Sequence, residues 1–220
     1  MTKTLTLLHT SPAHINTFDI LLQEIAPNIP VQQIVDETLL QAAREAGEIT
    51  PTLANRIQQT ISDAAGSNGS VVLCTCSTIG GWAEQATETT NKVVIRVDRP
   101  MAERAIALGR RIIVAATLES TIIPTRELLL SVAQEAGKPI EIIELFCETA
   151  WSKFEAGDQQ GYIHDIAQAL HGRASAGDVI VLAQASMAAA AELCVDLTIP
   201  ILSSPRLGLE TALKAYHQQK

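Results

Sequence analysis

The chain has 220 residues, of which 47% are hydrophobic and 18% charged, a composition typical of a globular protein with ample core. Its net charge is −8 and its aromatic content is 3%, so basic phosphate-binding surfaces and base-stacking rings are not expected, and neither is a nucleic-acid partner. No apolar run approaches the roughly 18–20 residues that a membrane span requires. Segment 1–9 is too short and too alternating for a signal peptide, so we expect a cytoplasmic protein with no membrane partner.

Eight short segments rich in β-branched residues alternate with helical patterns along the chain. The predicted strands are 4–9, 30–35, 70–75, 92–97, 111–116, 139–144, 178–183 and 199–203. This alternation of strands and helices predicts parallel sheets flanked by helices, and therefore an α/β fold.

Residues that favour helix ends lie between these strands. Helix N-caps are predicted where a hydroxyl residue precedes a proline, at Ser11-Pro12, Thr50-Pro51 and Ser204-Pro205. Left-handed glycines at helix C-termini are predicted after three periodic stretches, at Gly66, Gly109 and Gly137.

The two sets of four strands repeat at a nearly constant spacing. Thr10 and Thr117 follow the first and the fifth strand and lie 107 positions apart. Cys76 and Gln184 follow the third and the seventh strand and lie 108 positions apart. The repeat predicts two similar Rossmann-like halves, related by a pseudo-twofold axis.

The first half is expected to comprise 1–98 with 204–220, and the second half 99–203. Ligands of open parallel sheets bind beyond the carboxyl ends of the strands. We therefore expect the active site in a cleft between the halves, with Cys76 opposite Gln184.

Cys76 ends an apolar strand at the point where the chain turns into a predicted helix. The helix dipole is expected to lower the pKa of its thiol toward the reactive thiolate. The hydroxyl and backbone N–H groups of Ser77 and Thr78 can hold a carboxylate beside it. A base next to an anion-binding site suits proton transfer at an acidic carbon.

The remaining cysteines and the histidines suggest no metal site. Cys74, Cys147 and Cys194 follow apolar patterns and are expected to be free thiols packed in the core. The Cys-x-Cys pair has no second pair at ligand spacing, and the five histidines are scattered, so no metal is predicted. His9 and His14 flank the exit of the first strand, as structural residues or as residues that reach the cleft.

Three segments together resemble the aspartate/glutamate/hydantoin racemase superfamily, which includes arylmalonate decarboxylase and maleate isomerase relatives. Segment 73–78, Leu-Cys-Thr-Cys-Ser-Thr, resembles the first cysteine motif, Cys-Asn-Thr. Segment 181–187 resembles the second cysteine motif, and segment 114–117 resembles the strand and threonine that open the second half. The likeness covers nearly the whole chain in element order and length.

The resemblance implies cofactor-independent chemistry at the carbon next to a carboxylate, by a racemase or epimerase of amino acids and their derivatives that forms a homo-oligomer. In two-cysteine members, one thiolate removes the α-proton and the other thiol reprotonates the opposite face. By position, Cys76 and Gln184 take the two catalytic places. The implied binding residues for a small carboxylate substrate are Thr10, Ser11, Ser77, Thr78, Thr117, Thr121, Ala185 and Ser186.

Gln184 departs from the pattern, because an amide donates and accepts hydrogen bonds but is neither an acid nor a base near neutral pH. Three alternatives to a symmetric racemase therefore stay open. A single-cysteine decarboxylase or isomerase is one, although relatives that decarboxylate malonates keep the second thiol. A catalytically silent carboxylate-binding protein is another. A flavodoxin-like nucleotide binder is the third, although no Gly-rich phosphate loop follows a strand.

Overall fold

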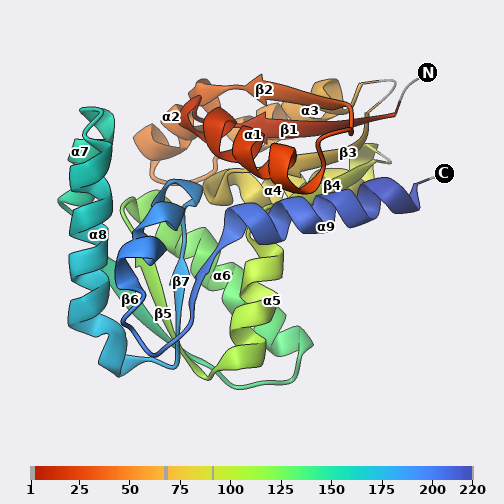
Figure 1. Cartoon of the computed structure of the whole chain (residues 1–220). Coiled ribbons are helices and arrows are strands. Elements are labelled where there is room, and N and C mark those ends of the chain that lie inside the picture. The colour runs from red at the N-terminus through yellow and green to blue at the C-terminus, as the bar shows by residue number, and fades with distance from the viewer. Residues whose placement is uncertain (1–2, 67–68, 91, 220) are drawn as a thin grey trace. The chain divides into compact units, whose positions relative to one another are not determined.

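The computed structural model of the protein describes residues 3–66, 69–90 and 92–219. The chain divides into two compact units, which we call unit 1 (Met1–Arg99 and Pro205–Lys220) and unit 2 (Pro100–Ser204). Figure 1 shows the strands and helices of each unit. Unit 1 is built from two separate stretches of sequence, whereas unit 2 is continuous.

Unit 1 contains a four-stranded sheet whose neighbouring strands all run parallel, in the order β2-β1-β3-β4. The strands are β1 (Thr4–His9), β2 (Val31–Val35), β3 (Gly69–Cys74) and β4 (Val93–Arg96). The helices are α1 (Ala13–Ile25), α2 (Glu37–Ala46), α3 (Pro51–Ala65), α4 (Ser77–Thr90) and α9 (Ser204–Gln218).

Helices cover both faces of this sheet. Alternate residues of its central strands point to opposite faces, and the apolar residues on each face pack against helices. Leu8 and Val72 pack in one apolar cluster with residues of α2, α3 and α4. Leu7 and Leu73 pack in a second cluster with residues of α1 and α9. Burial on two sides explains why β3 is an almost continuous apolar run.

Unit 2 repeats this plan with parallel strands in the order β6-β5-β7-β8. Its strands are β5 (Arg111–Ala116), β6 (Glu141–Phe146), β7 (Val179–Leu182) and β8 (Ile201–Ser203). Its helices are α5 (Arg99–Leu108), α6 (Glu119–Glu135), α7 (Ala150–Glu155), α8 (Gln159–Arg173) and the 3₁₀ helices η1 (Ala174–Ala176) and η2 (Ala185–Cys194). The same strand order in both units confirms the prediction of an α/β fold with two similar halves.

The hydrogen bonds at the strand ends place Cys76 and Gln184 at equivalent positions of the two sheets. The N–H of Thr75 donates to the carbonyl of Leu8 at 3.0 Å, and the N–H of Ala183 donates to the carbonyl of Ala115 at 2.9 Å. Cys76 directly follows Thr75, and Gln184 directly follows Ala183.

Two of the predicted N-caps differ from the structure. Thr50 caps α3 as predicted, because its hydroxyl accepts the N–H of Leu53 at 3.3 Å. Pro12 takes the cap position of α1, and the Ser11 hydroxyl accepts the N–H of Ala13 at 3.4 Å. The prediction for Ser204 was wrong: it is the first residue of α9, and its buried hydroxyl has no partner among the described residues.

Of the three glycines predicted to be left-handed, Gly109 does not have a positive φ angle. Gly66 and Gly137 have φ angles of 47° and 63°, as expected at helix ends. Gly109 has no such angle, and a Cβ there would lie 2.6 Å from the Cβ of Asp178. Gly109 is therefore needed for close packing rather than for backbone conformation.

The segment after Gln184 forms the 3₁₀ helix η2, of ten residues. Side chains three residues apart eclipse one another in a 3₁₀ helix, which keeps most such helices short. Residues 188–191 of η2 are all alanine, so the eclipsing of side chains costs little in this ten-residue helix.

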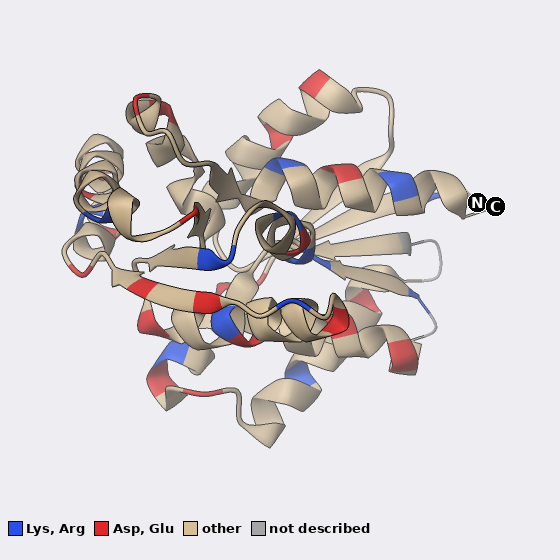
Figure 2. Cartoon of the chain, turned by 90° about the horizontal axis from the view of Figure 1, so that it is seen from below, with Lys and Arg blue, Asp and Glu red and all other residues tan. Residues whose placement is uncertain are grey.

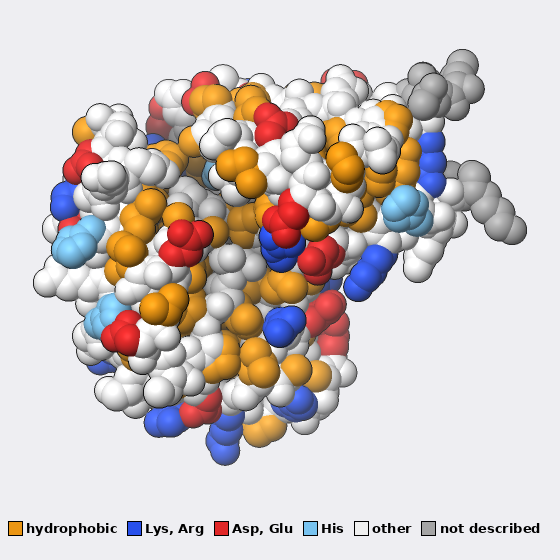
Figure 3. All heavy atoms as spheres, in the orientation of Figure 1, with side chains coloured by type: hydrophobic (Ala, Val, Ile, Leu, Met, Phe, Trp, Pro, Cys, Tyr) orange, Lys and Arg blue, Asp and Glu red, His pale blue; other side chains and the backbone are white. Residues whose placement is uncertain are grey.

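The surface carries charge of both signs. Lys and Arg residues stand singly among Asp and Glu along the helices (Figure 2). Exposed hydrophobic side chains lie among polar ones on the face drawn in Figure 3. Among the described residues, no helix combines the length and the apolar character needed to cross a membrane.

Candidate active site

Cys76 lies two residues beyond the end of β3 and immediately before α4. Four hydrogen-bond donors that favour its thiolate lie next to the sulfur, namely the hydroxyls of Thr10 and Thr78 and the backbone N–H groups of Thr78 and Ile79. The two N–H groups belong to the first turn of α4, where unpaired amides favour negative charge. Thr10 follows β1, the neighbour of β3 in the sheet. The surroundings of the sulfur therefore stabilise an anion.

Burial opposes these donors. The Cys76 side chain is 6% exposed, and its removal from water raises the pKa of the thiol above the ordinary value, because a buried thiolate loses its hydration. The donors offset part of this rise, with the Thr10 hydroxyl contributing most. The predicted lowering of the pKa was therefore wrong, and at neutral pH the unliganded thiol is protonated.

The Thr10 hydroxyl is buried next to this sulfur and is available to donate to a thiolate there. Thr10 is 2% exposed beside Cys76, and its Oγ1 atom has no hydrogen-bond partner among the described residues. The predicted binding residues Thr10 and Thr78 therefore lie beside Cys76. Ser77 is also buried and opens α4, whereas Ser11 is partly exposed at the start of α1.

Cys74 has the packing role that its apolar context predicts. It is 0% exposed within the cluster that includes Val72 and Ile79. Its S–H donates to the carbonyl of Cys76 over 3.7 Å, and burial raises the pKa of its thiol far above the ordinary value.

A buried ion pair supports the start of α4. Arg96, 5% exposed, donates from Nε and Nη2 to the carboxylate of Asp98, 0% exposed, at 2.7 and 3.0 Å. A Cβ on Gly80 would lie 3.1 Å from the Arg96 Nε atom. The guanidinium thus rests against the helix that carries two of the sulfur's donors. Sequence reasoning missed this pair, although its signal is an Arg and an Asp two positions apart at a strand end, after a helix that contains a Gly-Gly step.

In unit 2, Gln184 is held by Thr117. The side-chain Oε1 of Gln184 accepts the backbone N–H of Thr117 at 2.6 Å and its hydroxyl at 3.0 Å. These two hydrogen bonds orient the amide, so the Nε2 group of Gln184 points away from Thr117. Within the described residues this Nε2 group donates to no protein acceptor. Thr117 therefore positions Gln184. The N–H and the hydroxyl of Thr117, which could otherwise bind a carboxylate, both donate to Gln184.

Tyr162 of α8 extends this network. Its hydroxyl lies 2.8 Å from that of Ser186 and also hydrogen-bonds Thr117. Tyr162 is 0% exposed, and burial raises the pKa of its phenol. Sequence reasoning missed Tyr162 because a tyrosine inside a helical pattern gives no signal of its contacts. Of the other predicted binding residues, Ala185 opens η2 and Thr121 lies buried in the first turn of α6.

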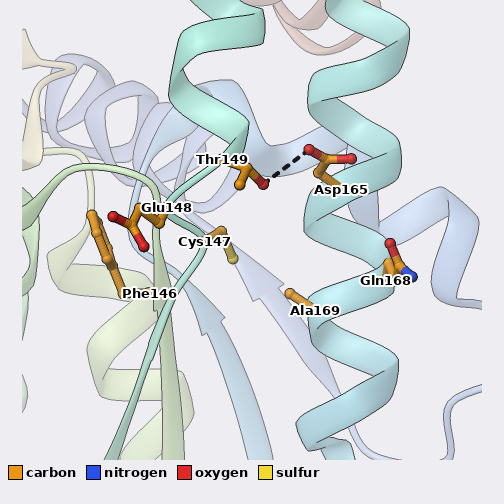
Figure 4. A pocket seen from close by; sticks show the side chains of 7 residues that line it. All are labelled: Phe146, Cys147, Glu148, Thr149, Asp165, Gln168 and Ala169. Atoms are coloured by element: carbon orange, nitrogen blue, oxygen red, sulfur yellow. Dashed lines mark hydrogen bonds between the residues drawn. The ribbon is translucent and has the colours of Figure 1, made fainter.

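Unit 2 also has a pocket of about 380 Å³ at the end of β6. It is lined by residues 146–149, Asp165, Gln168 and Ala169, with the Cys147 sulfur and the hydrogen-bonded Thr149 and Asp165 facing it (Figure 4). No predicted site residue lines this pocket. Among the residues that the structure describes, no three His, Cys, Asp or Glu side chains gather as metal ligands would.

Comparison with known proteins identifies the fold but not the family. No protein-family profile matches the sequence, and no curated protein matches it. Solved structures do. Glutamate racemase from Francisella tularensis subsp. tularensis SCHU S4, in complex with D-glutamate, matches with a TM-score of 0.74 and 16% identity, covering 99% of this chain and 82% of that one.

Picrophilus torridus aspartate racemase matches with a TM-score of 0.73 and 13% identity over 97% of this chain and 94% of that one. A sulfate-associated variant of arylmalonate decarboxylase matches with a TM-score of 0.60 and 18% identity over 99% and 94% of the two chains. The chain has the racemase fold. The sequence resemblance to this superfamily is confirmed at the level of fold.

Proposed function

We propose that the protein catalyses cofactor-independent proton transfer at the carbon α to a carboxylate, as a racemase or epimerase, with Cys76 moving the proton. The proposed substrate is a small carboxylic acid such as an amino acid or a derivative of one. The proposed setting is the cytoplasm, with neither nucleic acid nor a membrane as partner, and the proposed assembly is a homo-oligomer.

The observation that carries this proposal is the group of four donors that surround the Cys76 sulfur. Removal of the α-proton by the thiolate forms an S–H bond and leaves an enediolate on the substrate. Return of the proton to carbon restores the thiolate. Hydrogen bonds to a charged group contribute about 1.5–3 kcal/mol each, so these donors reduce the cost of forming the base in a buried place.

Gln184 has a binding role in this proposal. With Oε1 held by Thr117, its Nε2 group offers two N–H donors that suit a carboxylate or an enediolate. Gln184 cannot return a proton to the second face of the carbon. Return of the proton by Cys76 alone restores the original configuration, so inversion requires a solvent proton on the opposite face of the carbon.

Decarboxylation of a substituted malonate is a second candidate, and two observations favour it. The Cys76 thiol is protonated at neutral pH because burial raises its pKa. Gln184 leaves one proton-transfer group rather than two. In this reaction the malonate loses CO₂, the S–H proton passes to the resulting enediolate, and water then reprotonates the thiolate.

Proton NMR in D₂O tests both reactions on a panel of amino acids, hydantoins, hydroxy acids and substituted malonates. We expect loss of the α-hydrogen signal, or release of CO₂, with the parent protein and none with Cys76→Ala. Cys194→Ala is the matched control, because Cys194 is also buried and its thiol lies in the core of unit 2.

The stereochemistry of the product separates the reactions. Racemic deuterated product indicates racemisation, and deuterated product of unchanged chirality indicates exchange on one face by a single thiol. Turnover that survives in Cys76→Ala contradicts the proposal. Carboxylate binding without turnover across the panel would make the protein a silent binding protein.

A further inference from the structure

A chain of buried hydrogen bonds joins the ends of three strands beside Cys76. The Nδ1 atom of His9, at the end of β1, lies 2.8 Å from the hydroxyl of Thr75, which follows β3. The Nε2 atom of His9 lies 2.9 Å from Oε1 of Gln33 in β2. His9 is 0% exposed and Thr75 is 1% exposed. The nitrogens of this imidazole therefore tie β1 to both of its neighbours.

The hydrogen bond between Gln33 and Asp19 determines which nitrogen of His9 carries the proton. The Nε2 group of Gln33 donates to the Asp19 carboxylate at 2.6 Å, so Oε1 of Gln33 must face His9 as an acceptor. His9 therefore holds its proton on Nε2 and offers Nδ1 as an acceptor. The Thr75 hydroxyl donates to Nδ1 at 2.8 Å in preference to the Leu8 carbonyl at 3.1 Å.

This bond lies where the Cys76 site is assembled. Thr10 follows His9 in the chain and has a buried, unpartnered hydroxyl beside the sulfur, while Cys76 follows Thr75. The backbone of His9 is fixed as well, because its carbonyl accepts the N–H of Asp36 at 2.9 Å. His9 precedes Thr10 and Thr75 precedes Cys76. The hydrogen bond between His9 and Thr75 thus sets the separation of the Thr10 hydroxyl from the sulfur.

We propose that His9, in its Nε2–H form, is a positioning residue that holds the Thr75–Cys76 segment against the end of β1, so that the Thr10 hydroxyl reaches the Cys76 sulfur. Its effect on catalysis rests on the proposed function, but its effect on the thiol does not. Protonation of His9 removes the acceptor for Thr75, whose hydroxyl then turns to the Leu8 carbonyl.

The surroundings of His9 favour the neutral imidazole. Burial lowers the pKa of His9, and the Gln33 bond and the Asp19 carboxylate offset part of this change. Titratable neighbours of His9 are His14 of α1, whose ring centroid lies 6.2 Å away, the Asp19 carboxylate, and Asp36, whose N–H donates to the His9 carbonyl. Cys74 is paired with Leu8 in the sheet, and Cys76 lies two residues beyond it. His14 is neutral for the same reason, because burial lowers its pKa to about 4. The acceptor is thus present at neutral pH.

The test is a pH titration of the Cys76 thiol by ¹³C NMR of protein labelled at the cysteine Cβ, with assignment by Cys76→Ser. Thr75→Val removes the hydroxyl with little change in volume, and Thr75→Ser keeps it. Thr6→Val is the matched control, because Thr6 is 1% exposed in β1 and its hydroxyl has no partner among the described residues.

We expect Thr75→Val to decrease the ionisation constant of the Cys76 thiol about tenfold, since a hydrogen bond to the thiolate is weakened. Thr75→Ser and Thr6→Val should titrate like the parent. Histidine ¹⁵N shifts should show the Nε2–H form of His9 in the parent. An unchanged titration in Thr75→Val, or an Nδ1–H form of His9, would overturn the inference.

Activity separates this inference from the proposed function. If the exchange reaction exists, Thr75→Val should lower kcat more than it raises KM, because the substrate-binding donors remain. If no substrate turns over but the thiol titrations behave as expected, the positioning role stands and the proposed function fails. If turnover is found but the titrations do not move, the reverse holds.

Discussion

Cys76 shows how local and long-range effects compete at one atom. The position of the thiol before a helix follows from the sequence, because an apolar strand, two hydroxyl residues and a Gly-Gly step are all visible in it. The direction of its pKa shift does not follow, since burial depends on residues that other elements bring to the sulfur. The Thr10 hydroxyl is separated from Cys76 by more than sixty positions, and pattern analysis cannot tell that it faces the sulfur.

His14 should make the protein sensitive to acid. In the folded chain its pKa is lowered from 6.5 to about 4, because burial and the nearby His9 disfavour a positive charge. The unfolded chain therefore binds a proton at this residue before the folded chain does, and stability falls as the pH drops from 6.5 toward 4. The full loss is about 3 kcal/mol.

Urea unfolding at neutral pH and at about pH 4.5 measures this effect. We expect His14→Phe to lose less stability on acidification than the parent does. His164→Gln is the control for removal of a histidine as such, because His164 is exposed on α8. Equal acid sensitivity in His14→Phe and the parent would show that His14 is not the group responsible.

At the scale of elements, the strands were predictable and the helix ends were less so. β1 and β5 have the predicted bounds because each combines β-branched and apolar residues over a short segment. The 3₁₀ geometry of η2 could not be predicted, since an alanine run satisfies either helical geometry. The packing role of Gly109 was hidden because its contact, Asp178, lies in a different element. Sequence patterns therefore identify elements better than the contacts between them.

The contact between α9 and the end of β4 requires a glycine. A Cβ on Gly208 would lie 2.6 Å from the carbonyl oxygen of Val97 and 2.7 Å from its Cγ2 atom. We expect Gly208→Ala to destabilise the protein by about 1–3 kcal/mol, because the helix must move away from the strand. Thermal or urea unfolding followed by circular dichroism measures this change.

Gly172 in α8 provides the matched substitution, because a Cβ there meets no atom within 4 Å. Gly172→Ala should leave stability unchanged or increase it by up to about 1 kcal/mol, since alanine favours a helix over glycine. Similar effects of the two substitutions would mean that helix propensity, and not the contact with Val97, dominates at Gly208.

At the scale of the whole molecule, the order of the elements makes unit 1 dependent on the end of the chain. α9 supplies Leu209 and Ala212, both 0% exposed, to the cluster that contains Leu7 and Leu73. Fragment 1–99 lacks this helix and would leave that face of its sheet open to water. Unit 2 has no such gap, because its strands and helices are contiguous in sequence.

The two ends of unit 1 lie close to each other, which allows a direct test of this dependence. The hydroxyl of Tyr216 in α9 donates to the carbonyl of Lys3 at 2.9 Å. A short linker can therefore join the termini of a permuted unit 1 that begins at Pro205 and ends at Arg99. We expect this permuted chain and fragment 100–204 each to unfold cooperatively on heating, because each then contains its own core as one continuous stretch. Fragment 1–99 should show no cooperative transition by circular dichroism. A cooperative transition of 1–99 at the same temperature as the permuted chain would show that α9 covers unit 1 without stabilising it.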